Sequence, residues 1–501
     1  MRSKKAFKNI ISSLILQIVS IVTGLIVPNL IISFYGSAIN GLVASITQFL
    51  GYITLLEAGV GGVTRAALYK PLSEKNNFKI SSIMKATESF FKKIGLLFLG
   101  YLAILGITLP VVVKSDYPAT FIFLLVLIMG CSTFFQYYFG ITNQLLLQAD
   151  QKQYIVFYLQ SATMLINTIL IVLFIRAGLN IHIVQIFSAI VFVFRPLMLR
   201  RYVLKNYNLI QDTVKDDNAI KQRWDGLGHH IANTVHSSTD VALITLFLNI
   251  KEVSVYSIYF LVVSGVKKIS VTIFTGVESA FGNMLARKEN ENLNKNFDVF
   301  EFLTFSIVTV LFTSTGILII SFISIYTREA TDVNYIRPVF AYILVLSEAI
   351  YCIRIPFNTI ILAAGHYKQT RNGAFVEAAI NIITSVILLK FLGIAGVAIG
   401  TLIAMSYRTI ELVIYLSKNI LQRNIFKFLK KVLIYSLAVI MICILASFLP
   451  SYNINSLYNW LIYATVILFI SISVMTLIGL VFYRYELIDL TKLLKRIFVR
   501  S

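Results

Sequence analysis

Charge is scarce in this sequence. Only 13% of its 501 residues are Asp, Glu, Lys or Arg, whereas 57% are hydrophobic and the mean hydropathy is +0.81. A soluble chain of this length would need far more polar surface to face water, so a soluble protein is excluded. Apolar runs of about 20 residues, long enough to cross a bilayer as helices, recur from end to end. We therefore predict an all-α, polytopic membrane protein.

Other scarcities exclude classes of function. The three cysteines, Cys131, Cys352 and Cys443, all fall within apolar runs, so neither a disulfide framework nor a thiolate metal site is expected. The sequence contains no GxxxxGK[ST] phosphate-binding loop, which argues against an ATPase within this chain. The predicted outer loops are short and leave little room for an outer catalytic domain. We expect a protein that is not an enzyme and has no catalytic residues, metal or cofactor.

Fourteen transmembrane spans are predicted from the apolar runs. They cover residues 10–33, 41–64, 94–113, 117–139, 154–175, 179–199, 227–249, 253–284, 299–324, 338–362, 372–389, 394–417, 432–450 and 459–482. With a cytoplasmic N-terminus, most of the 44 Lys and Arg residues fall in inside segments, which is the positive-inside pattern. The net charge of +21 therefore indicates topology rather than nucleic-acid binding. Both termini are expected in the cytoplasm.

Two halves of the sequence match at a separation of about 214 residues. The aligned pairs include Asn167 with Asn381, Gly178 with Gly393, and Arg195 with Arg408. Six spans in each half keep the two halves in the same orientation, as in transporters built from parallel repeats. We predict an N-lobe (1–212, spans 1–6), a C-lobe (213–424, spans 7–12) and an addition (425–501) holding spans 13 and 14 and a basic amphipathic tail. The substrate site is expected between the lobes, near the membrane midplane.

Polar residues share one face of the seventh predicted span. These are His229, Asn233, His236 and Asp240, spaced +4, +3 and +4 along the helix. Gln17 and Ser20 occupy the corresponding face of the first span. Two such faces favour an aqueous cleft between the lobes; interhelical hydrogen bonding inside a packed bundle is the alternative. The spacing matches no recognised metal signature, so no metal site is expected.

Five basic residues fall inside the spans. They are Lys267, Lys268, Arg354, Arg408 and Arg195. Each costs about 2.5–3.5 kcal/mol at a helix centre, so most must face water, a partner or the inner interface. Snorkelling to the cytoplasmic headgroups is the alternative for Arg195 and Arg408. The candidate acidic partners are Glu57, Asp240, Glu278, Glu348 and Glu377. Buried cations favour an anionic substrate, for which phosphate is the obvious chemistry.

One stretch resembles a known family. Residues 34–72, FYGSAINGLVASITQFLGYITLLEAGVGGVTRAALYKPL, are similar to the opening of bacterial polysaccharide flippases. These form the polysaccharide transporter family of the multidrug/oligosaccharidyl-lipid/polysaccharide exporter (MOP) superfamily. Within the motif LLEAGVGG, only Glu57, Gly59, Gly61 and Gly62 can be matched to residues of the family.

The resemblance implies a flippase of the bacterial cell membrane, without a metal or organic cofactor. Its substrate would be an undecaprenyl-diphosphate-linked oligosaccharide, the repeat unit of an O-antigen or capsule. Alternating access of the two lobes around a cationic cavity would move this substrate from the inner to the outer leaflet. Membrane lipids, a polysaccharide polymerase and chain-length machinery are candidate partners, and nucleic acid is not.

Several alternatives stay open at this point. A cation-coupled multidrug exporter of the same superfamily and a lipid II flippase would share the architecture. A membrane glycosyltransferase or polymerase would need catalytic residues on a sizeable outer loop, and an inactive scaffold would not need buried charge. Asp240 with His236 is a candidate site for a coupling proton or sodium ion, and membrane potential is the other candidate driving force.

Overall fold

A computed structural model describes residues 2–57, 59–210, 213–224, 239–274, 277–449, 454 and 456–491. The described chain is helical throughout, apart from turns, loops and one isolated β-bridge. Thirteen helical segments in it are long and apolar enough to cross a membrane. The predicted all-α, polytopic class is confirmed. The seventh predicted span, 227–249, falls mostly outside the described residues, so the count of fourteen and the orientation of the termini remain predictions.

The chain divides into two compact units, which we call the N-unit (Met1–Ser257) and the C-unit (Ile258–Ser501). The principal elements of the N-unit are α1 (Arg2–Tyr35), α2 (Ser37–Gly51), α3 (Thr54–Glu57), α4 (Val60–Ser73), α5 (Asn77–Val112), α6 (Ala119–Phe135), η1 (Gln136–Gly140), α7 (Ile141–Ala149), α8 (Gln153–Arg176), α9 (Ile181–Asn206) and η2 (Asp217–Trp224). Helix α11 (Ile250–Ile273) crosses from one unit into the other. The C-unit continues with α12 (Val277–Ala286), α13 (Asn290–Tyr326), α14 (Pro338–Ile353), α15 (Ile355–Ala363), α16 (Tyr367–Leu392), α17 (Ile394–Asn419), α18 (Phe426–Ser447) and α19 (Leu457–Phe482). The lobe boundaries expected from the repeat remain predictions.

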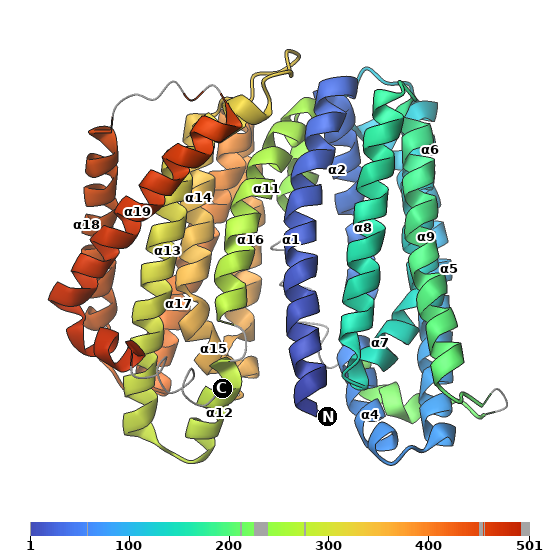
Figure 1. The fold of residues 1–501 in the computed structure, drawn as a ribbon, viewed down its shortest axis with the longest axis horizontal. Helices are drawn as coiled ribbons and strands as arrows, with labels where there is room; N and C mark the ends of the chain where they lie inside the picture. The colour runs from blue at the N-terminus through green and yellow to red at the C-terminus, as the bar shows by residue number, and fades with distance from the viewer. Residues whose placement is uncertain are drawn as a thin grey trace. The chain divides into compact units, whose positions relative to one another are not determined.

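The long helices of the N-unit pack side by side. Helix α8 packs on both α1 and α9, and α6 packs on both α5 and α9 (Figure 1). The chain turns sharply between α3 and α4, where Gly59 has φ +79°. Only glycine adopts this left-handed conformation without strain, which explains one glycine of the LLEAGVGG motif.

Residues 239–257 pack against α2 inside the N-unit. Ser45 Oγ lies 2.7 Å from Thr245 Oγ1, and Asn40 Nδ2 donates to Ser254 Oγ at 2.8 Å. A Cβ added to Gly41 would overlap the carbonyl oxygen of Ile250. The glycine therefore allows α2 and the start of α11 to approach closely.

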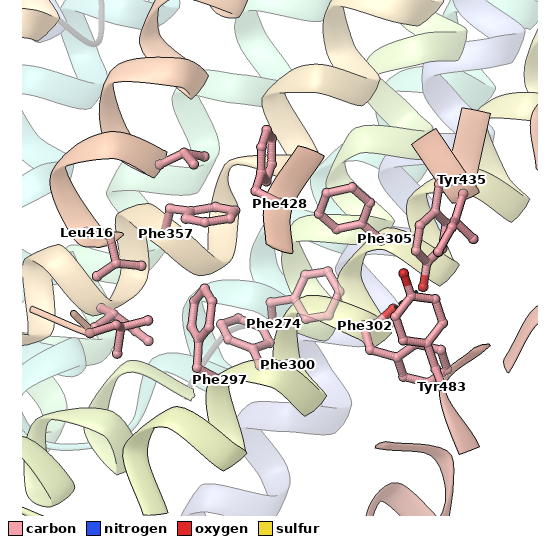
Figure 2. Packing of buried hydrophobic residues seen from close by; sticks show 14 of the residues in the cluster. Phe274, Phe297, Phe300, Phe302, Phe305, Phe357, Leu416, Phe428, Tyr435 and Tyr483 are labelled. Carbon is pink, nitrogen blue, oxygen red and sulfur yellow. Dashed lines mark hydrogen bonds between the residues drawn. The ribbon is translucent and has the colours of Figure 1, made fainter. Parts of the chain in front are cut away.

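The C-unit is built around an aromatic core. Figure 2 shows rings from α13, α15 and α18 stacked edge to face, among them Phe297, Phe357 and Phe428. The core continues to Tyr435 and Tyr483, whose ring centroids lie 5.8 Å apart. Buried aromatic pairs each contribute about 0.5–1.5 kcal/mol beyond the area they bury. This core joins the added helices α18 and α19 to α13.

In each unit one membrane-length helical segment has an irregular turn, at positions that the predicted repeat aligns. In the N-unit, α6 passes into α7 through the π-helical turn η1, which ends at Gly140. In the C-unit, α14 ends at Ile353 and α15 begins at Ile355; Arg354 between them keeps a helical backbone, and Pro356 has no N–H to continue the ladder. The repeat separation of about 214 residues places Gly140 opposite Arg354, which lies at the second irregular turn. The packing of the two helices is also similar. Helix α14 packs on α13 and α17, and helix α6 packs on α5 and α9.

Candidate functional site

The irregular turn between α14 and α15 lies within a cluster of charged residues. Lys267 on α11 places its Nζ 2.8 Å from a carboxylate oxygen of Glu348 on α14. Glu348 is only 3% exposed, so this ion pair is largely removed from solvent. The same ammonium group lies 3.6 Å from the ring centroid of Tyr351, which is close enough for a strong cation–π contact.

Arg354 forms the second ion pair of the cluster. Its Nη1 donates to Glu377 Oε1 on α16 at 2.6 Å. Its guanidinium lies 4.4 Å from the ring centroid of Tyr351. Because one aromatic ring contacts both Lys267 and Arg354, the two ion pairs form a single cluster rather than two separate contacts.

Arg408 on α17 completes the cluster. Its Nε lies 3.7 Å from Glu377 Oε2, and its Nη1 donates to the carbonyl of Thr370 at 3.0 Å and to the carboxylate of Glu411. Arg408 is 7% exposed, so its guanidinium is held by carboxylates inside the unit. Gly373 makes room for this arrangement, since a Cβ there would overlap the carboxylate of Glu411.

The cluster lies well inside its helices. Glu377 lies ten residues into α16, and Arg408 lies 14 residues into α17. Both helices are long and apolar enough to cross a membrane.

The cluster is nearly balanced in charge. Lys267, Arg354 and Arg408 face the carboxylates of Glu348, Glu377 and Glu411. A buried ion pair lowers the large cost of an unpaired charge, and breaking one leaves a charge uncompensated. An anion that enters this site must therefore compete with the carboxylates for the cations. A phosphate group is suited to do so, because it offers several charged oxygens to the guanidinium fork.

The other two predicted basic residues lie apart from these ion pairs. Lys268 is exposed and, among the described residues, has no carboxylate within ion-pair distance. Arg195 belongs to the N-unit, where its Nη2 donates to Gln136 Oε1 at 3.4 Å. Its Nε is buried without a hydrogen-bond partner in the described structure. Arg195 and Arg408 align in the predicted repeat but differ in surroundings, since among the described residues only Arg408 has carboxylate partners.

The polar face of the seventh predicted span is described only in part. His229, Asn233 and His236 lie outside the described residues. Asp240 is buried, and its Oδ2 accepts a hydrogen bond of 2.8 Å from the hydroxyl of Tyr256. Gln17 and Ser20 are half-buried on α1. The aqueous cleft between the two faces stays a prediction.

The remaining predicted carboxylates occupy different surroundings. Glu57 ends α3 and accepts a hydrogen bond of 3.2 Å from the hydroxyl of Tyr137, which lies in the π-helical turn η1. Glu278 is exposed on the short helix α12, after α11 has already ended at Ile273. Within the described ranges, no group of three or more His, Cys, Asp or Glu residues is arranged to hold a metal ion.

Two members of the cluster were not predicted from the sequence. Tyr351 lies three residues after Glu348 and three before Arg354, and Glu411 lies three residues after Arg408. Residues three or four apart share one face of a helix, so this spacing could have predicted that Tyr351 and Glu411 lie beside the charged residues.

A second buried charged cluster was also missed. Glu301 on α13 is fully buried and accepts two hydrogen bonds from the guanidinium of Arg423, of 2.9 and 2.7 Å. It also accepts one of 2.7 Å from Lys431 on α18. The guanidinium of Arg423 lies 4.5 Å from the ring centroid of Phe297. This cluster joins α13 to α18, the first of the two added helices.

The fold is shared with solved membrane transporters. A structure described as the lipid II flippase MurJ in an inward closed conformation superposes with a TM-score of 0.73 at 16% identity, covering 95% of this chain and 100% of that one. An inward-facing multidrug resistance MATE family transporter of the MOP superfamily gives 0.63 at 12% identity, over 79% and 93%. A ligand complex of the MATE multidrug transporter DinF-BH gives 0.60 at 17% identity, over 83% and 95%.

Comparison of the sequence with known proteins does not identify a family for this chain. No model of a known protein family matches the chain, and no curated protein matches it. At these identities the likeness is one of fold. The chain is a multi-pass membrane protein with the fold of MOP-superfamily flippases and transporters.

Proposed function

We propose that this protein is a flippase of the bacterial cell membrane. It moves an undecaprenyl-diphosphate-linked oligosaccharide, the repeat unit of a surface polysaccharide such as an O-antigen or capsule, from the inner to the outer leaflet. The observation that carries the proposal is the buried cluster of Lys267, Arg354 and Arg408, which lies at the irregular turn between α14 and α15. Charged residues buried within membrane-spanning helices mark substrate or ion pathways in many transporters.

The diphosphate binds by displacing carboxylates from the cations. In the empty site, Glu348 and Glu377 hold Lys267 and Arg354 in place. The diphosphate brings several charged oxygens, and each cation exchanges one anionic partner for another. The cations keep an anionic partner throughout, and the released carboxylates must take up protons or reach water, because an unpaired buried charge is costly.

The membrane potential contributes to the cycle in this proposal. Each negative charge that moves outward across an inside-negative membrane gains about 2.3 kcal/mol per 100 mV. The lipid tail stays in the bilayer while the sugar and diphosphate pass through the protein, and the two halves expose the site alternately to each side. Transport into liposomes should therefore slow when the potential is collapsed with valinomycin and equal potassium.

Two other substrates suit the same fold, each for its own reason. The likeness to a lipid II flippase over 95% of the chain favours lipid II. The carboxylates of Glu348, Glu377 and Glu411 favour a cationic drug, because an exporter of cations needs acidic groups in its site. We place both behind the polysaccharide repeat unit, since the three carboxylates are already paired with basic residues and the opening motif resembles polysaccharide flippases.

The test depletes the protein and measures what accumulates. We expect loss of surface polysaccharide and accumulation of undecaprenyl-diphosphate-linked repeat units, measured by mass spectrometry. Wild type should restore both, whereas the triple variant Lys267→Gln/Lys268→Gln/Arg354→Gln should not. The matched control is Lys418→Gln/Lys427→Gln/Lys430→Gln, which removes three exposed charges from the same unit and should restore both.

The other outcomes identify the alternatives. Accumulated lipid II with normal repeat units would indicate a lipid II flippase. Normal levels of both lipids with altered sensitivity to cationic drugs would indicate an exporter. A triple variant that is present at wild-type abundance and restores export fully would contradict the role of the cluster.

A further inference from the structure

A cavity of about 720 Å³ lies in the N-unit between α5, the end of α3 and the 3-10 helix η2. Its polar lining comes from Ser89 and Lys93 on α5 and from Asp217, Asn218 and Lys221 on η2. Its apolar lining includes Phe90, Ile94 and Leu97, all on α5. The volume is within the range of about 300–1,000 Å³ that is typical of small-molecule sites.

The segment that carries one wall of the cavity is fastened to α5. Lys215 Nζ donates to Ser89 Oγ at 2.8 Å, and Lys85 Nζ donates to the carbonyl of Thr213 at 2.9 Å. The hydroxyl of Ser82 donates to the carbonyl of Val214. These contacts hold the chain before η2 along the helix, so the two lysines that line the cavity come from elements that are tied together.

The lining changes from basic to apolar along α5. Ser89, Lys93 and Leu97 are four residues apart and therefore lie along one face of the helix. In the predicted topology, α5 runs from the cytoplasm into the membrane, which places Lys93 at the level of the headgroups. Leu97, one turn further, is 64% exposed and suits contact with lipid chains. The cavity thus offers two lysines and the single carboxylate of Asp217 at the membrane surface, with an apolar wall just beneath.

We propose that this cavity binds an anionic phospholipid of the inner leaflet. Lys93 and Lys221 face the phosphate, and Ser89 and Asn218 supply hydrogen bonds to the headgroup. The acyl chain begins along Ile94 and Leu97. An anionic lipid is favoured over a zwitterionic one, because the two lysines outnumber the single carboxylate of Asp217 and leave an excess of positive charge in the lining. It is favoured over free phosphate, because free phosphate leaves the apolar wall unused.

The test uses the full-length protein in a neutral detergent. Native mass spectrometry would measure bound lipid with phosphatidylglycerol, phosphatidylcholine or sn-glycerol 3-phosphate added. We expect phosphatidylglycerol to bind more tightly than phosphatidylcholine, and glycerol phosphate to compete weakly. The Lys93→Gln/Lys221→Gln variant should bind phosphatidylglycerol on the order of tenfold more weakly, since each lysine contributes to attraction at an anionic surface.

Two further variants separate a site from general surface charge. Lys70→Gln/Lys79→Gln removes two exposed charges of the N-unit that do not line the cavity and should bind phosphatidylglycerol as wild type does. Asn218→Trp keeps both lysines but fills the cavity, and should weaken binding as much as the double lysine variant.

Three results would overturn the proposal. They are equal binding of the two phospholipids, full competition by glycerol phosphate, and an Asn218→Trp protein that binds phosphatidylglycerol normally. None of them bears on the transported substrate, so this proposal and the proposed function can fail independently.

Discussion

The ammonium nitrogen of Lys267 lies 3.6 Å from the ring centroid of Tyr351. The same ring lies 4.4 Å from the guanidinium carbon of Arg354. A cation–π contact contributes about 2 kcal/mol when it is desolvated, so one aromatic side chain here stabilises two buried cations. Tyr351 therefore connects the Lys267–Glu348 pair with the Arg354–Glu377 pair, since its ring contacts the cation of each.

Replacing Tyr351 should disturb both ion pairs at once. We expect Tyr351→Leu to lower the melting temperature and to reduce transport, because it removes the ring from both cations. Tyr351→Phe keeps the ring and should retain most of both properties. Thermal unfolding in detergent and complementation of depleted cells would measure the two effects. If Tyr351→Leu and Tyr351→Phe had the same melting temperature and complemented equally well, the role of the ring would be contradicted.

The Lys267–Glu348 pair should separate stability from transport. Lys267→Met leaves the buried carboxylate of Glu348 without its ammonium partner, which should cost on the order of 3–5 kcal/mol in the free energy of unfolding. Lys267→Met/Glu348→Gln should recover most of that loss, because no charge is left uncompensated. Transport should be lost in both variants, since the substrate cation is absent from both. A double variant that is stable and also transports would show that Lys267 has only a structural role.

Part of the cluster was accessible from the sequence. Any charge inside a span needs a partner, which is why Glu348 and Glu377 were expected beside the basic residues, and both do pair with them. The predicted tenth span, 338–362, agrees with the helical segment Pro338–Ala363, but the irregular turn at Arg354 within it was not expected. Pro356 was the signal, since a proline inside a helix removes a hydrogen bond.

Pairings between helices were the part that the sequence did not determine. Which carboxylate meets which cation depends on how α11, α14, α16 and α17 are packed, and one sequence contains no measure of that. The Glu301 cluster was missed for a different reason. Arg423 and Lys431 fall between predicted spans, where basic residues are expected in any case as a topology signal.

The Glu301 cluster should anchor the two added helices. Glu301→Gln leaves Lys431 buried beside a neutral group and leaves Arg423 with Asp298 as its remaining carboxylate partner, so we expect a loss of several kcal/mol in the free energy of unfolding. Replacing all three residues by Leu or Met of similar volume should restore much of the stability, as is observed for other buried ion pairs. Thermal unfolding of the three proteins would measure this. A Glu301→Gln protein as stable as wild type would contradict the anchoring role.

The inner end of α1 should be sensitive to acid. Asp150 accepts a hydrogen bond of 2.6 Å from the hydroxyl of Tyr207 and lies 2.7 Å from Lys152 and 3.2 Å from Lys5 at the start of α1. Burial alone would raise the pKa of Asp150, but the hydrogen bonds and charges of Lys152, Tyr207 and Lys5 outweigh it and lower the pKa below 3.8.

A lowered pKa sets the direction of the pH effect. The ionised form is favoured by folding, so its contribution is fully present above the unfolded pKa and is lost as the pH falls through the folded pKa. We expect Asp150→Asn to melt at a lower temperature than wild type by a constant amount from pH 8 to 5. That difference should shrink below about pH 4. A difference that stays constant down to pH 3 would mean that the carboxylate charge is not what stabilises this end of α1.

Ser45 on α2 and Thr245 lie in contact inside the N-unit but belong to different predicted lobes, 1–212 and 213–424, so we expect their contact to open and close during transport. In the predicted topology this contact lies towards the outer side, and the two hydroxyl oxygens are 2.7 Å apart. Because the two side chains are in contact, these positions are suitable for a cysteine pair, whose disulfide requires a Cβ separation of about 3.5–4.5 Å. We expect Ser45→Cys/Thr245→Cys, in a chain whose native cysteines are replaced, to crosslink rapidly with a mild oxidant. Crosslinking should stop transport and a reductant should restore it, because alternating access requires the outer side to separate.

Each single cysteine variant should transport with and without oxidant. If the crosslinked protein transports at the rate of the reduced one, α2 and residue 245 stay together throughout the cycle, and the opening to the outer side must lie elsewhere.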